Sequence, residues 1–117
     1  MGSRFEDLYL FLQSKGFEAF APGTKKGQCE KPYLVVKPTE GVKVLSLSST
    51  KRYYDIMCFS KTVSGAEQLK EQVREAMKSI YPLFNPTSNE TQPFFDDGVK
   101  GWMTSIEYVN YRKIEHF

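Results

Sequence analysis

Two stretches of the chain carry apolar residues at the three-to-four-residue spacing of an amphipathic helix. The first covers residues 3–14, where Ser3 and Glu6 have the spacing of a capping box, which satisfies free amides in a first helical turn. We expect this helix to end at Gly16, because glycine is favoured just beyond helix C-termini. Its apolar stripe predicts one buried face and consists of Phe5, Leu8, Tyr9 and Leu12.

Residues 64–81 give the clearest helical pattern. Ser64 and Glu67 form a second capping-box pair, and Pro82 ends the helix because proline cannot continue one. The buried face is predicted to contain Leu69, Val73, Met77 or Ala76, and Ile80. The opposite face is interpreted as solvated and carries Glu67, Lys70, Glu71, Arg74, Glu75 and Lys78.

Four stretches have the composition or the alternation of β-strands. Residues 32–37 are rich in β-branched and aromatic side chains, and residues 42–48 change their apolar phase between Val44 and Leu45, which predicts a bulge. Residues 52–60 are apolar on both faces, so we expect this strand either at the centre of a sheet or covered on both sides. In the last strand, residues 101–113, the predicted core positions are Trp102, Thr104, Ile106 and Tyr108.

Two segments lack a regular pattern. Residues 21–30 are polar and turn-forming, and they are interpreted as a mobile surface loop. Residues 83–98 form a long polar segment, and long loops in compact domains are often functional. Phe94 and Phe95 stand out in this segment. We expect one ring to fold back into the core and the other to be an exposed anchor for a partner's pocket.

The predicted element order is helix, three strands, helix, strand, which fits one α+β domain spanning residues 1–117. The natural solution is an antiparallel β-sheet of about four strands with both helices packed on one face. A chain of 117 residues has the commonest size for one domain. Because the connection from residue 59 to residue 102 encloses the second helix, the last strand can return beside any of the first three.

Composition narrows the classes of partner. Aromatic residues make up 15% of the chain, which fits either a core filled with large side chains or a wide protein–protein contact. The net charge of +2 comes from 16 basic and 14 acidic residues, a balance that argues against a nucleic-acid footprint. Lys25 and Lys26 are therefore interpreted as solvated loop charges.

The sequence also predicts a cellular compartment. No stretch approaches the roughly 18 apolar residues of a membrane span, and the first residues lack the core of a signal peptide. Cys29 and Cys58 lack the spacing of a zinc or redox motif, so Cys58 is interpreted as a small core residue and Cys29 as a free thiol in a loop. We therefore expect synthesis in a cytoplasm and a reducing environment.

No constellation of residues predicts catalysis. His116 is the only histidine, and its place near the end of the chain disfavours a Cys29–His116 dyad, because terminal residues rarely hold the geometry of a general base. Asp96 and Asp97 lack the alternating ligands of a calcium loop, so they are interpreted as turn and capping residues before the last strand. We expect no enzyme activity, no metal and no cofactor.

Three segments carry a resemblance to a known family. They are residues 31–38 (KPYLVVKP), residues 52–60 (RYYDIMCFS) and residues 86–113 (PTSNETQPFFDDGVKGWMTSIEYVNYRK), in this order around the charged helix. Together they resemble the small tail-completion proteins of siphophages and related prophages, in particular the tail-terminator and head–tail joining group. The resemblance covers roughly three-quarters of the chain, and residues 21–30 have no counterpart in the family.

The resemblance implies a structural virion protein that caps the end of the phage tail tube as a ring, commonly of six copies, and helps to join tail to head. Its partners would be copies of itself and the tail-tube and head-connector proteins, at the head–tail interface of the virion. Alternatives are a prophage or host protein-binding module without a virion role, a head-connector completion protein, or a minor hydrolase. The candidate contact residues are Lys25, Lys26, Asn89, Phe94, Phe95, Asp96 and Asp97.

Overall fold

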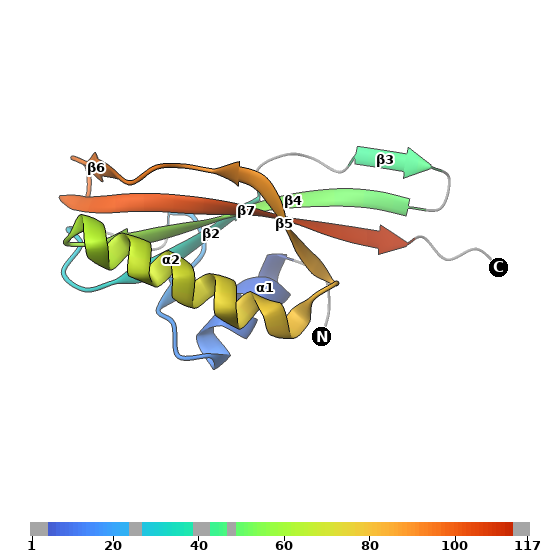
Figure 1. The fold of residues 1–117 in the computed structure, drawn as a ribbon, viewed down its shortest axis with the longest axis horizontal. Coiled ribbons are helices and arrows are strands. Elements are labelled where there is room, and N and C mark those ends of the chain that lie inside the picture. Colours follow the sequence, from blue (N-terminus) through green and yellow to red (C-terminus); the bar gives the residue numbers. More distant parts are fainter. Residues whose placement is uncertain (1–4, 24–26, 39–42, 47–48, 114–117) are drawn as a thin grey trace.

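The computed structural model describes residues 5–23, 27–38, 43–46 and 49–113. In these residues the chain combines helices with a β-sheet (Figure 1), which confirms the α+β class. The helices are α1 (Phe5–Ser14), α2 (Val63–Met77) and the short 3-10 helix η1 (Lys78–Ile80). The strands are β1 (Ala19–Phe20), β2 (Tyr33–Pro38), β3 (Lys43–Ser46), β4 (Ser49–Ser60), β5 (Phe84–Glu90), β6 (Phe94–Asp96) and β7 (Gly101–Lys113).

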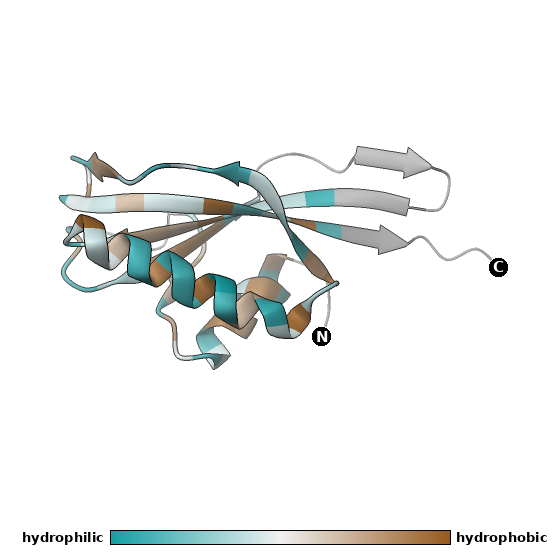
Figure 2. Ribbon diagram, in the orientation of Figure 1, coloured by the Kyte–Doolittle hydropathy of each residue, from teal (hydrophilic) through white to brown (hydrophobic). Residues whose placement is uncertain are grey.

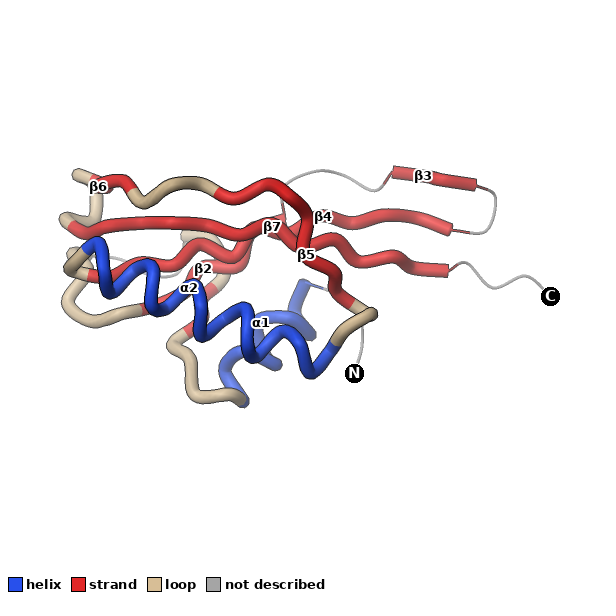
Figure 3. The backbone as a smooth tube through the Cα atoms, viewed as in Figure 1, coloured by secondary structure: helices blue, strands red, loops and turns tan. Residues whose placement is uncertain are grey.

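All seven described strands belong to one sheet. Its path is β1-β2-β4-β7-β5, with β3 added beside β4 and β6 added beside β7. The long strands β4 and β7 form the central antiparallel pair (Figure 3), whereas β1 and β2 pair in parallel. The prediction of about four antiparallel strands is therefore wrong in both number and order, because three short strands were not recognised and one pair is parallel.

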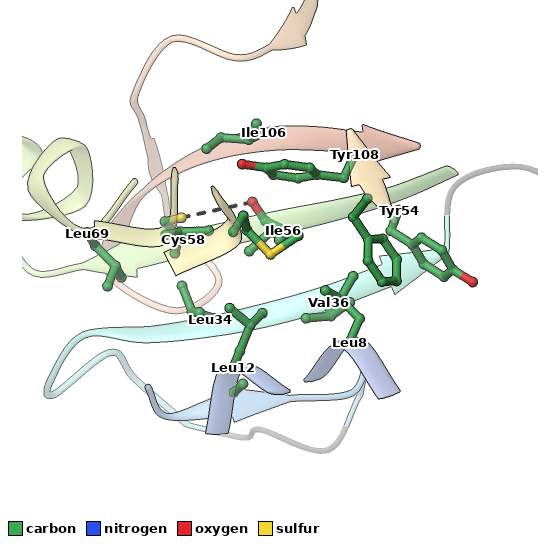
Figure 4. Close-up of a cluster of buried hydrophobic side chains, with 14 residues drawn as sticks. Leu8, Leu12, Leu34, Val36, Tyr54, Ile56, Cys58, Leu69, Ile106 and Tyr108 are labelled. Atoms are coloured by element: carbon green, nitrogen blue, oxygen red, sulfur yellow. Dashed lines mark hydrogen bonds between the residues drawn. The ribbon is translucent and has the colours of Figure 1, made fainter. Parts of the chain in front are cut away.

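Both helices lie on the same face of the sheet, as predicted (Figure 1). Hydrophobic and hydrophilic residues alternate along α2 (Figure 2), and its buried apolar positions include Leu69, Val73 and Met77. These side chains pack on alternate residues of the central strands (Figure 4). The main core also contains Leu8, Leu12, Ala19, Leu34, Val36, Tyr54, Ile56, Cys58, Phe84, Ile106 and Tyr108.

The helix boundaries differ from the prediction at the start of α2. Thr62, which has extended backbone, caps the helix by accepting a hydrogen bond from the Gly65 amide at 3.0 Å, so the helix begins before Ser64. Ser3, the predicted first cap, lies outside the described residues. Gly16 has a φ of +94° and ends α1 as predicted. No helix in the described ranges is long and apolar enough to cross a membrane.

A second apolar cluster covers part of the sheet face opposite the helices. Tyr33 and Phe59 stack there with ring centroids 4.7 Å apart, next to Val35, and β4 is thus buried on both faces as predicted. Cys29 is also buried in this cluster, and its amide donates to the Val99 carbonyl at 2.6 Å. Residues 21–30 were expected to form a surface loop, but Cys29 within this range is buried in the cluster.

Gly101 is the residue that permits this covering, and it gives a first testable prediction. A Cβ added at Gly101 would lie 2.7 Å from the Cβ of Cys29 and 3.2 Å from the carbonyl oxygen of Ser60. Neither neighbour can move freely, so Gly101→Ala should lower the free energy of unfolding by about 1–3 kcal/mol, as overpacked cores do. Urea denaturation checks this value.

Gly98→Ala is the matched control for this substitution. Its added Cβ would approach only the Oδ1 atom of Asp96, at 3.1 Å, and that carboxylate lies at the end of a side chain that can shift. We expect a much smaller change in the urea midpoint. Equal losses for the two variants would contradict the packing of Cys29 on Gly101.

The segment at residues 83–98, predicted as a loop, contains two strands. β5 pairs with β7 at Phe84–Pro86 and again at Glu90, and β6 pairs with the first three residues of β7. Backbone pairing with one edge of β7 holds these polar residues in strand conformation. Their side-chain propensities therefore gave little indication of a strand. Pro86 is compatible with β5 because proline is tolerated in edge strands.

Candidate functional site

The β6–β7 hairpin brings together four of the predicted contact residues. Phe94 and Phe95 lie in β6 and are 45% and 48% exposed. The expectation that one ring folds back into the core is wrong, because β6 is a three-residue strand at the outer edge of β7. Phe95 packs edge-on against Trp102, with ring centroids 5.8 Å apart. Trp102, favoured as a core position over an exposed anchor, is only half-buried and packs against this exposed ring.

The two acidic residues of this hairpin shape its turn. Asp96 accepts a hydrogen bond from the Gly98 amide at 2.9 Å, and Asp97 accepts one from the Lys100 ammonium group at 2.8 Å. Lys100 has a φ of +54°, in the left-handed region that tight turns require. The interpretation of Asp96 and Asp97 as turn residues is confirmed. The exposed Asp97 carboxylate also places a negative charge next to the two phenylalanines.

Asn89 lies apart from the hairpin and has a different role. The register of β5 against β7 shifts between Pro86 and Glu90, and Asn89 is in this bulge. Its side-chain amide and the Thr87 hydroxyl each donate to the same oxygen of Glu107, at 2.9 Å. These bonds fix the bulge on the strand beneath it. Lys25 and Lys26, the other predicted contacts, lie outside the described residues.

A row of charged residues crosses the sheet face next to this bulge. In the register of the sheet, Asp55 of β4 lies opposite Glu107 of β7 on one side and opposite Lys37 of β2 on the other. Burial and the nearby Glu107 carboxylate raise the pKa of Asp55, and Lys37 acts in the opposite direction. Beside Glu107 the surface has a shallow, mostly polar hollow. This part of the face is polar, in contrast to the apolar cluster around Tyr33.

An apolar groove lies between the C-terminal end of α2 and β5, and we call it the α2–β5 groove. Its volume is about 370 Å³. The apolar lining comes from Met77, Tyr81, Phe84, Pro86 and Tyr108, and Arg74 and Lys78 complete its wall. Tyr81 is 66% exposed, a large fraction for an aromatic side chain. No pattern in the sequence indicates this groove, because its walls come from segments that only the fold brings together.

An ion-pair network borders the groove. Glu90 accepts hydrogen bonds from Lys70 at 3.0 Å and from Arg74 at 2.5 Å. The bond from Lys70, followed by the bond from Arg74, lowers the pKa of Glu90, and the bond to Glu90 raises the pKa of Arg74. Lys70 was predicted on the solvated face of its helix, but its side chain is only 10% exposed. The prediction failed because Glu90 of β5 reaches this side of α2 and pairs with Lys70 there.

The described residues also define what the cysteines can do. Burial raises the pKa of the Cys58 thiol to about 12, so this residue stays protonated and packs as a core side chain, as predicted. Cys29 is buried and forms no disulfide, and its thiol donates a hydrogen bond to the Lys31 carbonyl oxygen at 3.6 Å. His116, its only potential histidine partner, lies outside the described ranges. Among the described residues, no three of the histidine, cysteine, aspartate or glutamate side chains gather as metal ligands would.

We also compared the sequence with known protein families and with curated proteins. Neither a scan against protein-family models nor a search of curated proteins finds a match to this sequence.

Proposed function

We propose that this protein is a structural assembly protein of a phage particle, which caps the end of the tail tube as a ring and helps to join tail to head. One observation carries the proposal: the small domain exposes two separate aromatic surfaces. The first surface is the end of the β6–β7 hairpin, where Phe94 and Phe95 are exposed on opposite faces of the sheet, and Tyr81 at the α2–β5 groove belongs to the second. Exposed apolar surfaces of this kind mark sites of protein association.

Two distinct surfaces are what a ring subunit needs. A subunit in a closed ring contacts one neighbour through one surface and the other neighbour through a different surface. The other large hydrophobic side chains that are exposed in the described part of the chain, Leu10 and Val63, are single residues on separate helices. Isolated apolar residues like these are normal on any protein surface.

The backbone of the sheet supports the same function. β5 and β6 lie at one edge and β3 lies beside β4, so unpaired backbone groups face outward along several short strands. Such edges are protected when another chain adds a strand or covers them. In the proposed particle these edges would contact further copies of the chain, the tail-tube protein and the head connector. The resemblance to tail-completion proteins points to these partners.

Deletion of the gene from a phage or prophage that encodes it tests this function. We expect lysates with full heads and with unjoined or overlong tails, because nothing would stop the tube or join it to the head. Negative-stain electron microscopy measures both defects, and a plasmid copy of the gene should restore joined particles. Normal joined particles from the deletion phage would refute the proposal.

A further inference from the structure

We infer that copies of this chain associate head to tail, with the β6–β7 hairpin of one copy inserted in the α2–β5 groove of the next. This inference rests on the proposed function, since it names the contact by which the ring would form. Both surfaces are aromatic, but they differ in shape and in charge. The hairpin projects and has the acidic Asp97 at its turn, whereas the groove is a hollow with the basic Lys78 in its wall.

The hairpin has the properties of an inserting element. Phe94 and Phe95 are nearly half exposed, and pairing of all three β6 residues with β7 holds their backbone in place. A preorganised element loses little conformational entropy on binding. Aromatic side chains supply much of the binding energy when a partner buries them. The Asp97 carboxylate at the adjacent turn adds a negative charge.

The groove has the complementary properties. Its volume of about 370 Å³ lies near the lower end of the roughly 300–1,000 Å³ range of ligand pockets, which suits an aromatic side chain better than a large cofactor. Its apolar wall includes Tyr81 and Pro86, and Lys78 contributes an ammonium group that is largely exposed. The groove is therefore apolar with two basic residues, Arg74 and Lys78, in its wall.

The charges at the two surfaces are free to exchange partners. Asp97 pairs with Lys100 and Lys78 pairs with Glu75, each within three residues in the same chain. Exposed ion pairs of this type contribute about 0–1 kcal/mol to stability, so they break readily in favour of an ion pair between chains. An Asp97–Lys78 pair would then orient the inserted hairpin.

The contact must form between two copies, because one chain cannot reach its own groove. Phe95 lies opposite Trp102, whereas the groove is lined by Tyr108, six residues further along the same strand. Six residues of β-strand span about 20 Å. Figure 1 shows β6 near the start of α2, whereas the groove is at the end of this helix. Contacts between two different surfaces build rings or open chains of subunits.

A mixing experiment with the full chain tests the geometry of this contact. The first variant, Phe94→Ala with Phe95→Ala, lacks the exposed rings on both faces of the hairpin, and the second, Tyr81→Glu with Lys78→Glu, has an altered groove. We expect the wild type to form dimers and larger species as its concentration rises in sedimentation velocity. Each variant alone should stay monomeric. Their equimolar mixture should form dimers that do not grow, because only one intact hairpin and one intact groove can meet.

Controls separate this result from loss of the fold. Leu10→Ala removes an equally exposed apolar side chain from α1 and should leave association unchanged. All variants should keep the circular dichroism spectrum and the thermal midpoint of the wild type within a few degrees. If a hairpin or groove variant unfolds, Phe94→Ser and Lys78→Ala serve as milder replacements in the same mixture.

Charge reversal tests the orientation of the inserted hairpin. Asp97→Lys and Lys78→Asp should each raise the dissociation constant of the dimer about tenfold or more, and the two together in one chain should restore most of the loss. A wild type that stays monomeric at millimolar concentration would overturn the inference. So would a variant mixture that stays monomeric, or a single variant that associates like the wild type.

These outcomes are independent of the test of the proposed function. If the deletion phage fails to join heads to tails but the hairpin and groove variants assemble normally, the inference is wrong and the function stands. If the variants lose association as expected but the deletion phage makes normal particles, the self-association stands and the virion function is wrong.

Discussion

Replacement of Phe84 by alanine is expected to lower the free energy of unfolding by about 3–5 kcal/mol, the usual cost of removing a buried phenylalanine ring. Phe84 is fully buried, and its ring meets Tyr54 edge-on with centroids 5.9 Å apart. Phe84 is the first residue of β5, and its side chain anchors this strand in the main core together with Met77 at the end of α2. Urea denaturation followed by circular dichroism measures the loss.

The matched control is Phe94→Ala in the same stretch of sequence. Phe94 is almost half exposed, so its removal should change the free energy of unfolding by less than about 1 kcal/mol. If Phe84→Ala does not fold, Phe84→Leu fills part of the space and should show a smaller loss in the same direction. Similar losses for Phe84→Leu and Phe94→Ala would contradict the burial of Phe84 in the main core.

The elements with a periodic apolar pattern could be predicted from the sequence. α2 and β7 have strong periodic patterns, and the predicted range of residues 101–113 agrees with the strand that the structure contains. A periodic apolar face is a local property, so it can be read without knowledge of partners. β4 was likewise recognised as central because both of its faces are apolar.

The rest of the sheet depends on partners that are distant in sequence. β5 has the sequence FNPTSNE, in which only the first residue is apolar and buried. Its strand conformation comes from the edge of β7, which offers backbone hydrogen bonds to any sequence that can lie beside it. No local pattern distinguishes such a segment from a loop. For the same reason, Phe84 could not be recognised as a core residue.

The residues of the candidate site also differ in whether a local stretch of sequence could predict that they lie together. Four of its residues, from Phe94 to Asp97, are consecutive, so the sequence alone could group them in one segment, although it predicted a loop there and not a hairpin. The groove required knowledge of how α2, η1, β5 and β7 meet. Asn89 was grouped with the hairpin because both belong to one polar segment. The bulge in β5 instead assigns Asn89 to a bond with Glu107.

The second large effect is expected at Glu90, which neutralises a buried lysine. Glu90→Ala leaves Lys70, whose side chain is only 10% exposed, without its ion-pair partner at 3.0 Å. Breaking a fully buried pair costs roughly 3–5 kcal/mol, and the partial exposure of Glu90 reduces this to about 2–4 kcal/mol. Lys70→Met combined with Glu90→Ala should recover most of the loss, because no buried charge then remains. Urea denaturation of the two variants checks both values.

Acid pH gives an independent measure of the same pair. The pKa of Glu90 is lowered in the folded state by hydrogen bonds from Lys70 and Arg74, so the folded protein favours the charged carboxylate. The stabilisation is complete above the ordinary pKa of glutamate, and it disappears as the pH falls through the lower folded pKa. The free energy of unfolding of the wild type should therefore fall more steeply below pH 4.5 than that of Glu90→Gln. Parallel pH profiles for the two proteins would show that the charge on Glu90 does not stabilise the fold, and that Lys70 is neutralised in another way.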